Sequence, residues 1–129
     1  MRALSVRQPW ASKIARGEKT IEVRSWSTSY RGTLLICAGK KPHGSDPTGV
    51  AVTVVDLVDC RPFVAGDEAA ACCDADPGDF AWVFSNVRPI EPLPVKGALG
   101  LFFVSVPIVE LSASAAVSTA PSLFDALTS

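Results

Sequence analysis

Short segments rich in β-branched and aromatic residues, bounded by Gly, Pro, Asn or Asp, constrain the fold of this chain more than any other feature. They lie at residues 33–38, 49–59, 80–86 and 99–106. A fifth segment, residues 20–24, alternates polar and apolar side chains, which is the pattern of a half-buried strand. These compositions favour strands over helices. The sequence therefore predicts a mainly β domain with some α structure (α+β) and about five to six strands.

One short helix is predicted before these strands, at residues 9–16. Pro9 suits the first turn of a helix, and Gly17 suits a C-terminal cap. Trp10 and Ile14 are four residues apart, so both are expected to face the core while other sides of the helix carry Lys13. A second helical stretch of one or two turns is expected at residues 66–73, followed by a turn at residues 76–79.

The alternating segment that follows the first helix predicts how its side chains divide between two faces. Ile21 and Val23 are expected to point inward, and Glu22 and Arg24 to share the opposite face. Lys19 precedes them at the turn between helix and strand. These polar residues are therefore expected to lie close together.

The length of 129 residues fits one domain, which we place at residues 1–110, followed by a flexible tail at residues 111–129 rich in Ala, Ser and Thr. No apolar run approaches the roughly 18–20 residues of a membrane helix. The first residues lack the apolar stretch of a secretory signal. We therefore expect a soluble, cytoplasmic protein with no membrane association.

The four cysteines are expected to be reduced thiols, since none is spaced as in a redox or zinc motif. Cys72 and Cys73 are adjacent, and the single histidine, His43, completes no metal-binding pattern with them. No metal or cofactor is therefore expected.

Charge is distributed unevenly along the chain. Residues 1–41 contain nine basic and two acidic residues, a net charge of +7, whereas the whole chain carries −1 and the remainder therefore −8. A local excess of positive charge indicates a polyanion-binding face. An ordinary solvated surface explains the same charges equally well.

Several motifs resemble those of the ASCH (activating-signal-cointegrator homology) domain family. The strongest are LSVRQPWAS at residues 4–12 and GEKTIEVRSW at residues 17–26. Further similarity is found at residues 30–36, 40–42, 55–60 and 92–97, so that the resemblance extends over about residues 1–107. It implies a PUA-like pseudo-β-barrel with a helix against one opening. It also implies binding of RNA or of single- or double-stranded DNA.

The residues around the first helix and strand are compatible with a ligand cleft. Arg24 can hold a phosphate or a base edge, Glu22 can accept from an exocyclic amine or orient Arg24, and Lys19 supplies a point charge. A weak exposed ion pair between Glu22 and Arg24 is the alternative. We predict that the nucleic-acid or nucleotide-like ligand contacts Arg7, Gln8, Lys13, Lys19, Glu22, Arg24, Trp26, Tyr30, Arg31, Lys40 and Lys41.

The aromatic residues divide into two groups. Trp26 and Tyr30 lie in a polar, basic segment and are candidates for stacking on bases. Trp10 and Trp82 lie in apolar patterns and are predicted to be core residues. Packing of Trp26 against the barrel is the alternative to stacking.

Two other classes of function remain open. Some small bacterial ASCH proteins hydrolyse amides of modified cytidine, of the N4-acetylcytidine type, or cleave RNA, and Lys19 matches their catalytic lysine. Glu22 stands where those enzymes have a catalytic threonine, so Lys19 and Glu22 are only candidates for a catalytic pair. An adaptor is the third class, because Ser122, Leu123 and Phe124 resemble the end of a sliding-clamp-binding peptide that lacks its leading glutamine.

Overall fold

The computed structural model describes residues 1–111, which contain six strands and three short helical segments. The strands are β1 (Arg2–Val6), β2 (Ile21–Arg24), β3 (Gly32–Ala38), β4 (Val50–Pro62), β5 (Phe80–Pro94) and β6 (Leu101–Phe103). The helices are α1 (Trp10–Ala15), a 3₁₀ turn (Ala65–Asp67) and α2 (Glu68–Ala71). No helix within residues 1–111 is long and apolar enough to cross a membrane. The predicted tail motif at Ser122, Leu123 and Phe124 lies outside the described residues.

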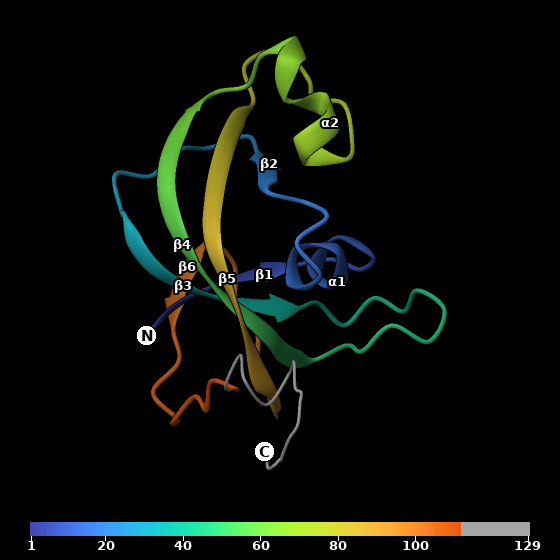
Figure 1. Ribbon diagram of the computed structural model, residues 1–129, viewed down its shortest axis with the longest axis vertical. Helices are drawn as coiled ribbons and strands as arrows, with labels where there is room; N and C mark the ends of the chain where they lie inside the picture. Colours follow the sequence, from blue (N-terminus) through green and yellow to red (C-terminus); the bar gives the residue numbers. More distant parts are fainter. Residues whose placement is uncertain (112–129) are drawn as a thin grey trace, which may run out of the picture.

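All six strands join one mixed sheet in the order β2-β5-β4-β3-β1-β6. Only β1 and β3 pair in parallel, and the other neighbours are antiparallel. The register between β4 and β5 shifts at three places, and such bulges bend strands. These two long strands curve around the molecule, and the sheet forms a half-barrel (Figure 1). The predicted mainly β fold with a short N-terminal helix is confirmed.

The sheet buries apolar side chains on both faces. Along β3, Leu34 and Ile36 pack on the face that α1 covers, whereas Leu35 and Cys37 pack on the other. Ile14 of α1 is fully buried in the first of these clusters. Because both faces of β3 are covered, its sequence is a continuous apolar run rather than an alternation.

Strand boundaries differ from the predictions where tertiary pairing decides them. β1 was not among the predicted strands, and it forms because its backbone pairs with both β3 and β6. β5 continues to Pro94, well past the predicted end at Asn86. The backbone of Asn86 has a φ of +53°, so the strand is irregular at this residue but does not end there. β6 retains only three residues of the predicted segment.

The two faces of β2 are occupied differently from the prediction. Ile21 is buried and Val23 half-buried, in a separate small cluster with Ala71 of α2 rather than in the main core. Glu22 is paired with Trp82 of β5, a member of the main core, so Glu22 and Arg24 face the interior of the half-barrel. Ile21 and Val23 thus pack in an apolar cluster, as predicted, but this cluster lies on the face of β2 that α2 covers, and Glu22 and Arg24 take the face toward the main core.

The 3₁₀ turn is held by a carboxylate whose protonation is expected to affect stability. Asp67 accepts two hydrogen bonds from Arg61 and one from the Val64 amide. The Arg61 hydrogen bonds, with a smaller effect of the Val64 amide, lower the pKa of Asp67 to about 2. A carboxylate with a lowered pKa stabilises the fold above its unfolded pKa, near 3.9, and loses this effect as the pH falls toward 2.

We therefore expect Asp67→Asn to weaken the acid dependence of the free energy of unfolding between about pH 4 and pH 2. The measurement is urea unfolding at a series of pH values. The exposed Asp74→Asn is the matched control, and it is expected to leave that part of the profile unchanged. An identical acid profile in Asp67→Asn and the native chain would contradict the assignment.

Candidate functional site

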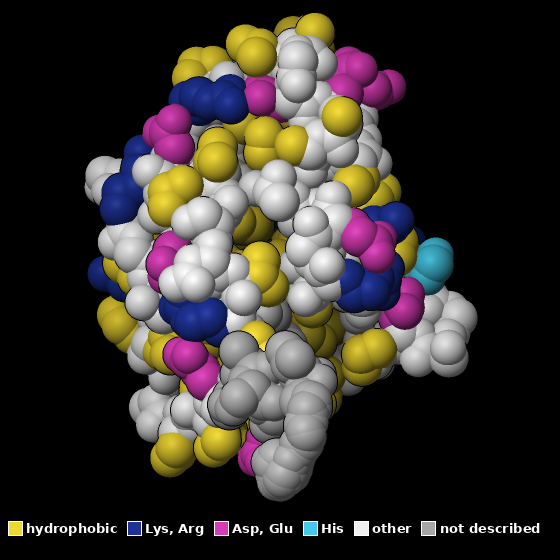
Figure 2. All heavy atoms as spheres, viewed as in Figure 1, with side chains coloured by type: hydrophobic (Ala, Val, Ile, Leu, Met, Phe, Trp, Pro, Cys, Tyr) yellow, Lys and Arg dark blue, Asp and Glu magenta, His cyan; other side chains and the backbone are white. Residues whose placement is uncertain are grey.

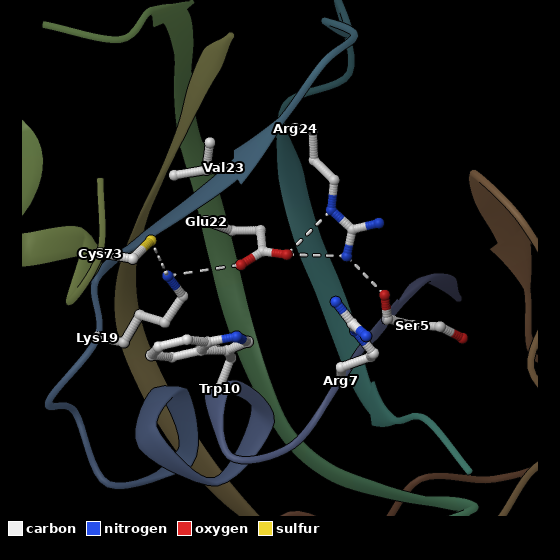
Figure 3. Close-up of a pocket in the computed structure, with 8 residues that line it drawn as sticks. All are labelled: Ser5, Arg7, Trp10, Lys19, Glu22, Val23, Arg24 and Cys73. Atoms are coloured by element: carbon white, nitrogen blue, oxygen red, sulfur yellow. Dashed lines mark hydrogen bonds and ion pairs between the residues drawn. The ribbon is translucent and has the colours of Figure 1, made fainter. Parts of the chain in front are cut away.

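A cavity of about 300 Å³ opens between α1, β1 and β2, with one wall from the segment after α2 (Figure 3). Its volume lies at the lower end of the range of small-ligand pockets, roughly 300–1,000 Å³. We call it the first cavity, and it is lined by Ser5, Arg7, Trp10, Lys19, Glu22, Val23, Arg24 and Cys73.

Glu22 is the centre of an ion-pair chain in this cavity (Figure 3). Its Oε2 accepts from Nε and Nη2 of Arg24 at 2.9 and 2.8 Å, and its Oε1 lies 3.6 Å from Nζ of Lys19. The side chain of Glu22 is 9% exposed and that of Lys19 only 2%. The arrangement is thus a buried ionic cluster and not the exposed ion pair of the alternative reading.

Lys19 is held in place by several contacts besides Glu22. Its ammonium group donates to the backbone carbonyl of Ala71 at 2.5 Å and lies 5.2 Å from the centre of the Trp10 ring. The sulfur of Cys73 is 4.0 Å away. Burial raises the pKa of the Cys73 thiol above its usual value, which the positive charge of Lys19 only partly offsets. Cys73 is therefore an uncharged wall of the cavity at neutral pH.

Local backbone geometry explains how Lys19 and Glu22 meet. α1 ends at Ala15 and is capped by Arg16, and the φ of +76° at the following Gly17 is the left-handed conformation that glycine favours after a helix C-terminus. The amide of Lys19 then donates to the carbonyl of Lys13, and the amide of Thr20 donates to the carbonyl of Ala70 in α2. The chain therefore turns sharply from α1 into β2, which brings Lys19 and Glu22 into the same cavity.

Some hydrogen-bonding groups in the first cavity have no partner among residues 1–111. Arg24 uses Nε and Nη2 for Glu22 and for the Ser5 carbonyl, at 2.6 Å, and leaves Nη1 free. Glu22 Oε1 has only the long contact to Lys19. Arg7 at the rim is exposed and forms no ion pair within the described part of the chain. The cavity therefore offers two donors and an acceptor to a polar ligand.

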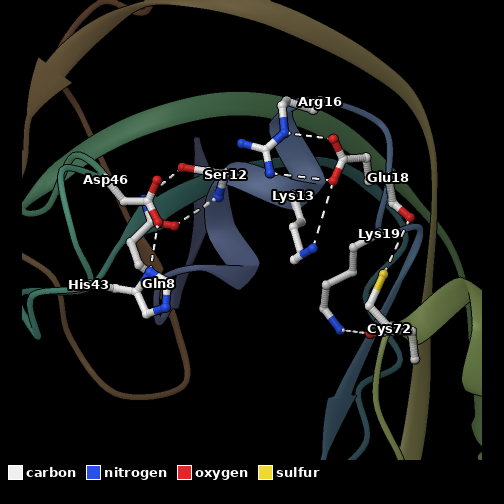
Figure 4. Close-up of polar contacts among 10 residues, drawn as sticks. Gln8, Ser12, Lys13, Arg16, Glu18, Lys19, His43, Asp46 and Cys72 are labelled. Atoms are coloured by element: carbon white, nitrogen blue, oxygen red, sulfur yellow. Dashed lines mark hydrogen bonds and ion pairs between the residues drawn. The ribbon is translucent and has the colours of Figure 1, made fainter.

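Gln8 was predicted to contact the ligand, and the structure places it in a buried capping role. Its side-chain oxygen accepts from the amide of Ser12, and its nitrogen donates to the Ser12 hydroxyl (Figure 4). The same nitrogen also donates to the Pro47 carbonyl. These bonds satisfy a free amide in the first turn of α1. Gln8 thus fixes the start of the helix that carries Trp10.

The predicted basic face is divided by ion pairs in the folded chain. Lys13 lies 3.8 Å from Glu18, and Arg31 lies 3.6 Å from Asp59. Figure 2 shows Lys and Arg side chains beside Asp and Glu over the face in view. In the described residues, neither Lys40 nor Lys41 forms an ion pair, and both are exposed. Within residues 1–111, the basic residues of the N-terminal third that form no ion pair are Arg2, Arg7, Lys40 and Lys41.

The two predicted stacking residues do not line the first cavity. Trp26 packs edge-on against Trp82, with ring centres 4.7 Å apart, and its carbonyl accepts from the Trp82 indole. The Tyr30 hydroxyl donates to the Thr33 carbonyl, and the Arg2 guanidinium lies 5.1 Å from the centre of its ring. Trp10, predicted as a core residue, is half-buried: it packs against the main core, and its ring also lines the cavity.

Four lining residues were absent from the predicted site: Ser5, Trp10, Val23 and Cys73. Trp10 lies three residues after Arg7, a predicted site residue, so its position at the start of the helix could have indicated that it lies near the site. Cys73 is 54 residues from Lys19, so no local pattern could have assigned it. Within residues 1–111, no group of three His, Cys, Asp or Glu side chains is placed to hold a metal ion.

The sequence was compared with families and proteins of known identity. The model of the ASCH domain matches residues 4–94, which is most of the chain. The chain belongs to the ASCH domain family. This ASCH domain is 40% identical to activating signal cointegrator 1 of Mus musculus, and 41% identical to that of Homo sapiens, over 120 residues in each case. Both alignments cover 73% of this chain but only 20% of the relative, so the chain spans about a fifth of their length.

Solved structures agree with this assignment at the level of the fold. The crystal structure of ASCH from Zymomonas mobilis has a TM-score of 0.65 and 14% sequence identity, covering 80% of this chain and 86% of that one. A mutant of the same protein matches with a TM-score of 0.60 and 13% identity, over 80% and 88% of the two chains. The pseudo-barrel predicted for this ASCH domain is thereby confirmed.

Proposed function

We propose that this ASCH domain binds single-stranded nucleic acid by taking one nucleotide into the first cavity. The observation that carries the proposal is the set of free polar groups there: Nη1 of Arg24, Oε1 of Glu22 and the guanidinium of Arg7. Two donors and one acceptor around a small cavity match the edge of a nucleobase together with its phosphate. A helical duplex is too wide to enter a cavity of about 300 Å³.

Each free group has a distinct role in this proposal. Glu22 Oε1 accepts from an exocyclic amine, such as that of cytosine or adenine, while Oε2 holds Arg24 in position. Arg24 Nη1 donates to a base oxygen or ring nitrogen. Arg7 stands at the rim, where its exposed charge can meet the phosphate.

Trp10 provides the stacking surface in place of Trp26. Its half-buried ring lines the first cavity, and Lys19 lies over that ring at 5.2 Å from its centre. A flat base entering the cavity can contact the exposed part of the indole, and such stacking contributes about 1–3 kcal/mol per base.

The chemistry of the lining residues favours binding over amide hydrolysis. Hydrolysis through a covalent intermediate requires an activated nucleophile. The hydroxyl and thiol groups of the first cavity belong to Ser5 and Cys73. The Ser5 hydroxyl points away from Arg24 (Figure 3), and burial keeps the Cys73 thiol protonated. Glu22, which takes the place of a hydrolase threonine, is committed to Arg24 and Lys19.

Binding of six-nucleotide oligocytidylate and oligodeoxycytidylate, at 50 and 200 mM salt, tests the proposal. We expect the affinity to fall with added salt, because phosphate contacts release counterions. Trp10→Leu is expected to weaken binding by about 1–3 kcal/mol, because Leu fills part of the site without a stacking surface. Affinity is measured by fluorescence anisotropy of the labelled oligonucleotide.

Trp26→Phe is the control for Trp10→Leu, since Trp26 packs against Trp82 outside the cavity. It is expected to retain the native affinity. The proposal fails if neither oligonucleotide binds, or if folded Trp10→Leu binds as tightly as the native chain.

A further inference from the structure

A second cavity, of about 400 Å³, lies on the other side of β1 from the first. Its walls come from the ends of β1 and β3, from the residue before β4 and from the segment after β5. They include Ser5, Gly39, Lys40, Val95, Lys96 and Gly97. Nothing in the proposed use of the first cavity involves this space.

Backbone hydrogen bonds bring the walls of the second cavity together. The amide of Gly49 donates to the carbonyl of Ala38 at 3.0 Å, and the amide of Val95 donates to Gly49 at 3.1 Å. Three segments far apart in the sequence are thereby fixed side by side. As a result, Lys40 and Lys96 line the same cavity although 56 residues separate them.

The two cavities are neighbours across β1. The carbonyl of Ser5 accepts from Arg24 in the first cavity, whereas its hydroxyl is turned to the opposite side (Figure 3). Ser5 lines both cavities. Arg7, which lines the first cavity, also lies against Gly39, which lines the second: a Cβ added to Gly39 would be 3.8 Å from Cα and Cγ of Arg7. Arg7 therefore stands between the first cavity and Lys40.

The polar groups of the second cavity suit an anion. Lys40 and Lys96 are exposed, and no carboxylate in residues 1–111 pairs with either of them. Ser5 adds a hydroxyl. Two uncompensated ammonium groups and a hydroxyl at one opening can neutralise and hydrogen-bond a phosphate.

Gly97 keeps the wall beside Ser5 open. A Cβ at this position would lie 2.6 Å from the Ser5 Oγ, closer than real contacts allow. Any larger residue would therefore displace the Ser5 hydroxyl.

We propose that the second cavity binds the phosphate and sugar of the nucleotide next to the one in the first cavity. The inference rests on the proposed function, and it assigns a path for the bound strand: from Arg24 past Arg7 to Lys40 and Lys96. Adjacent cavities connected by an unpaired arginine match the continuous negative charge of a nucleic-acid backbone. The second cavity thus extends the site from one nucleotide to two.

The test compares cytidine monophosphate with a six-nucleotide oligocytidylate. We expect Lys40→Ala combined with Lys96→Ala to lower hexamer affinity roughly tenfold at 50 mM salt and to reduce the salt slope by about 0.7, the value for one phosphate of a single strand. Affinity for the monophosphate, followed by NMR shifts of the Trp10 indole, is expected to stay within about twofold, because it occupies only the first cavity.

Lys41→Ala is the matched control, because Lys41 is the exposed neighbour of Lys40 and lines neither cavity. If Lys41→Ala lowers hexamer affinity as much as the double variant, the charge acts diffusely and the second subsite is disproved. If the native chain binds no hexamer, the proposed function itself fails. Replacing chloride by inorganic phosphate at equal ionic strength is expected to change the affinity of the native chain for the hexamer very little. If inorganic phosphate lowers the hexamer affinity of the native chain as much as the double substitution does, the second cavity is a site for free phosphate instead.

Discussion

Glu22→Gln is expected to lower the free energy of unfolding by about 3–5 kcal/mol, because it leaves buried positive charge without a counter-ion. Lys19 is 2% exposed, and its ammonium lies 3.6 Å from the carboxylate that the substitution removes. Arg24 loses its partner at the same time. Small domains are typically stable by only about 5–15 kcal/mol, so the variant is expected to be marginal. Chemical denaturation followed by circular dichroism provides the measurement.

A matched control and a second variant keep this expectation specific. Glu18→Gln removes the same charge from an exposed pair with Arg16, and it is expected to have little effect. Lys19→Met is expected to cost less than Glu22→Gln, because Glu22 then keeps Arg24 as its partner. The double variant Lys19→Met, Glu22→Gln is expected to be more stable than Glu22→Gln alone, because it no longer buries an unpaired ammonium group. Equal losses for Glu22→Gln and Glu18→Gln would show that the cluster is not effectively buried.

Arg24→Lys is expected to weaken oligonucleotide binding by about 2 kcal/mol, roughly thirtyfold, although the charge is unchanged. A guanidinium can bond Glu22 and Ser5 and still present Nη1 to a ligand. A single ammonium group cannot meet all three in one geometry. Anisotropy titration of the six-nucleotide oligocytidylate measures the change.

Arg61→Lys is the control for Arg24→Lys, since Arg61 makes a two-bond pair with Asp67 outside both cavities. Its affinity for the oligonucleotide is expected to match that of the native chain. Thermal unfolding of both variants separates loss of binding from loss of fold. Native affinity in a folded Arg24→Lys variant would remove Arg24 from the binding site.

Local sequence patterns predicted the part of the site that local geometry builds. Lys19, Glu22 and Arg24 lie within six residues, and a short helix terminated by the left-handed Gly17 and followed by an alternating strand is enough to bring them together. The other walls depend on distant pairing. β1 and β2 are separated by three strands in the sheet, so Ser5 reaches Arg24 only because the sheet curls into a half-barrel. Cys73 reaches Lys19 only because α2 packs against β2.

Side-chain environment was the property that sequence patterns predicted least well. Trp26 lies in a polar segment, yet it packs against Trp82, whereas Trp10 lies in an apolar pattern and faces the first cavity. Gln8 has a polar amide side chain that could bind a ligand, but this side chain caps α1. Whether such residues meet solvent, core or ligand depends on which neighbours cover them, and those neighbours come from other parts of the chain.

The sequence by itself determined five of the six strands, the first helix, the family and the grouping of Lys19, Glu22 and Arg24. Each of these depends on residues close together in the chain or on a recognisable motif. Only the tertiary structure decided that this group is buried, that many of the basic residues are neutralised by acidic ones, and that Lys40 and Lys96 meet at one cavity. Burial and charge compensation arise from contacts between distant segments, which strand order and register fix and local composition does not.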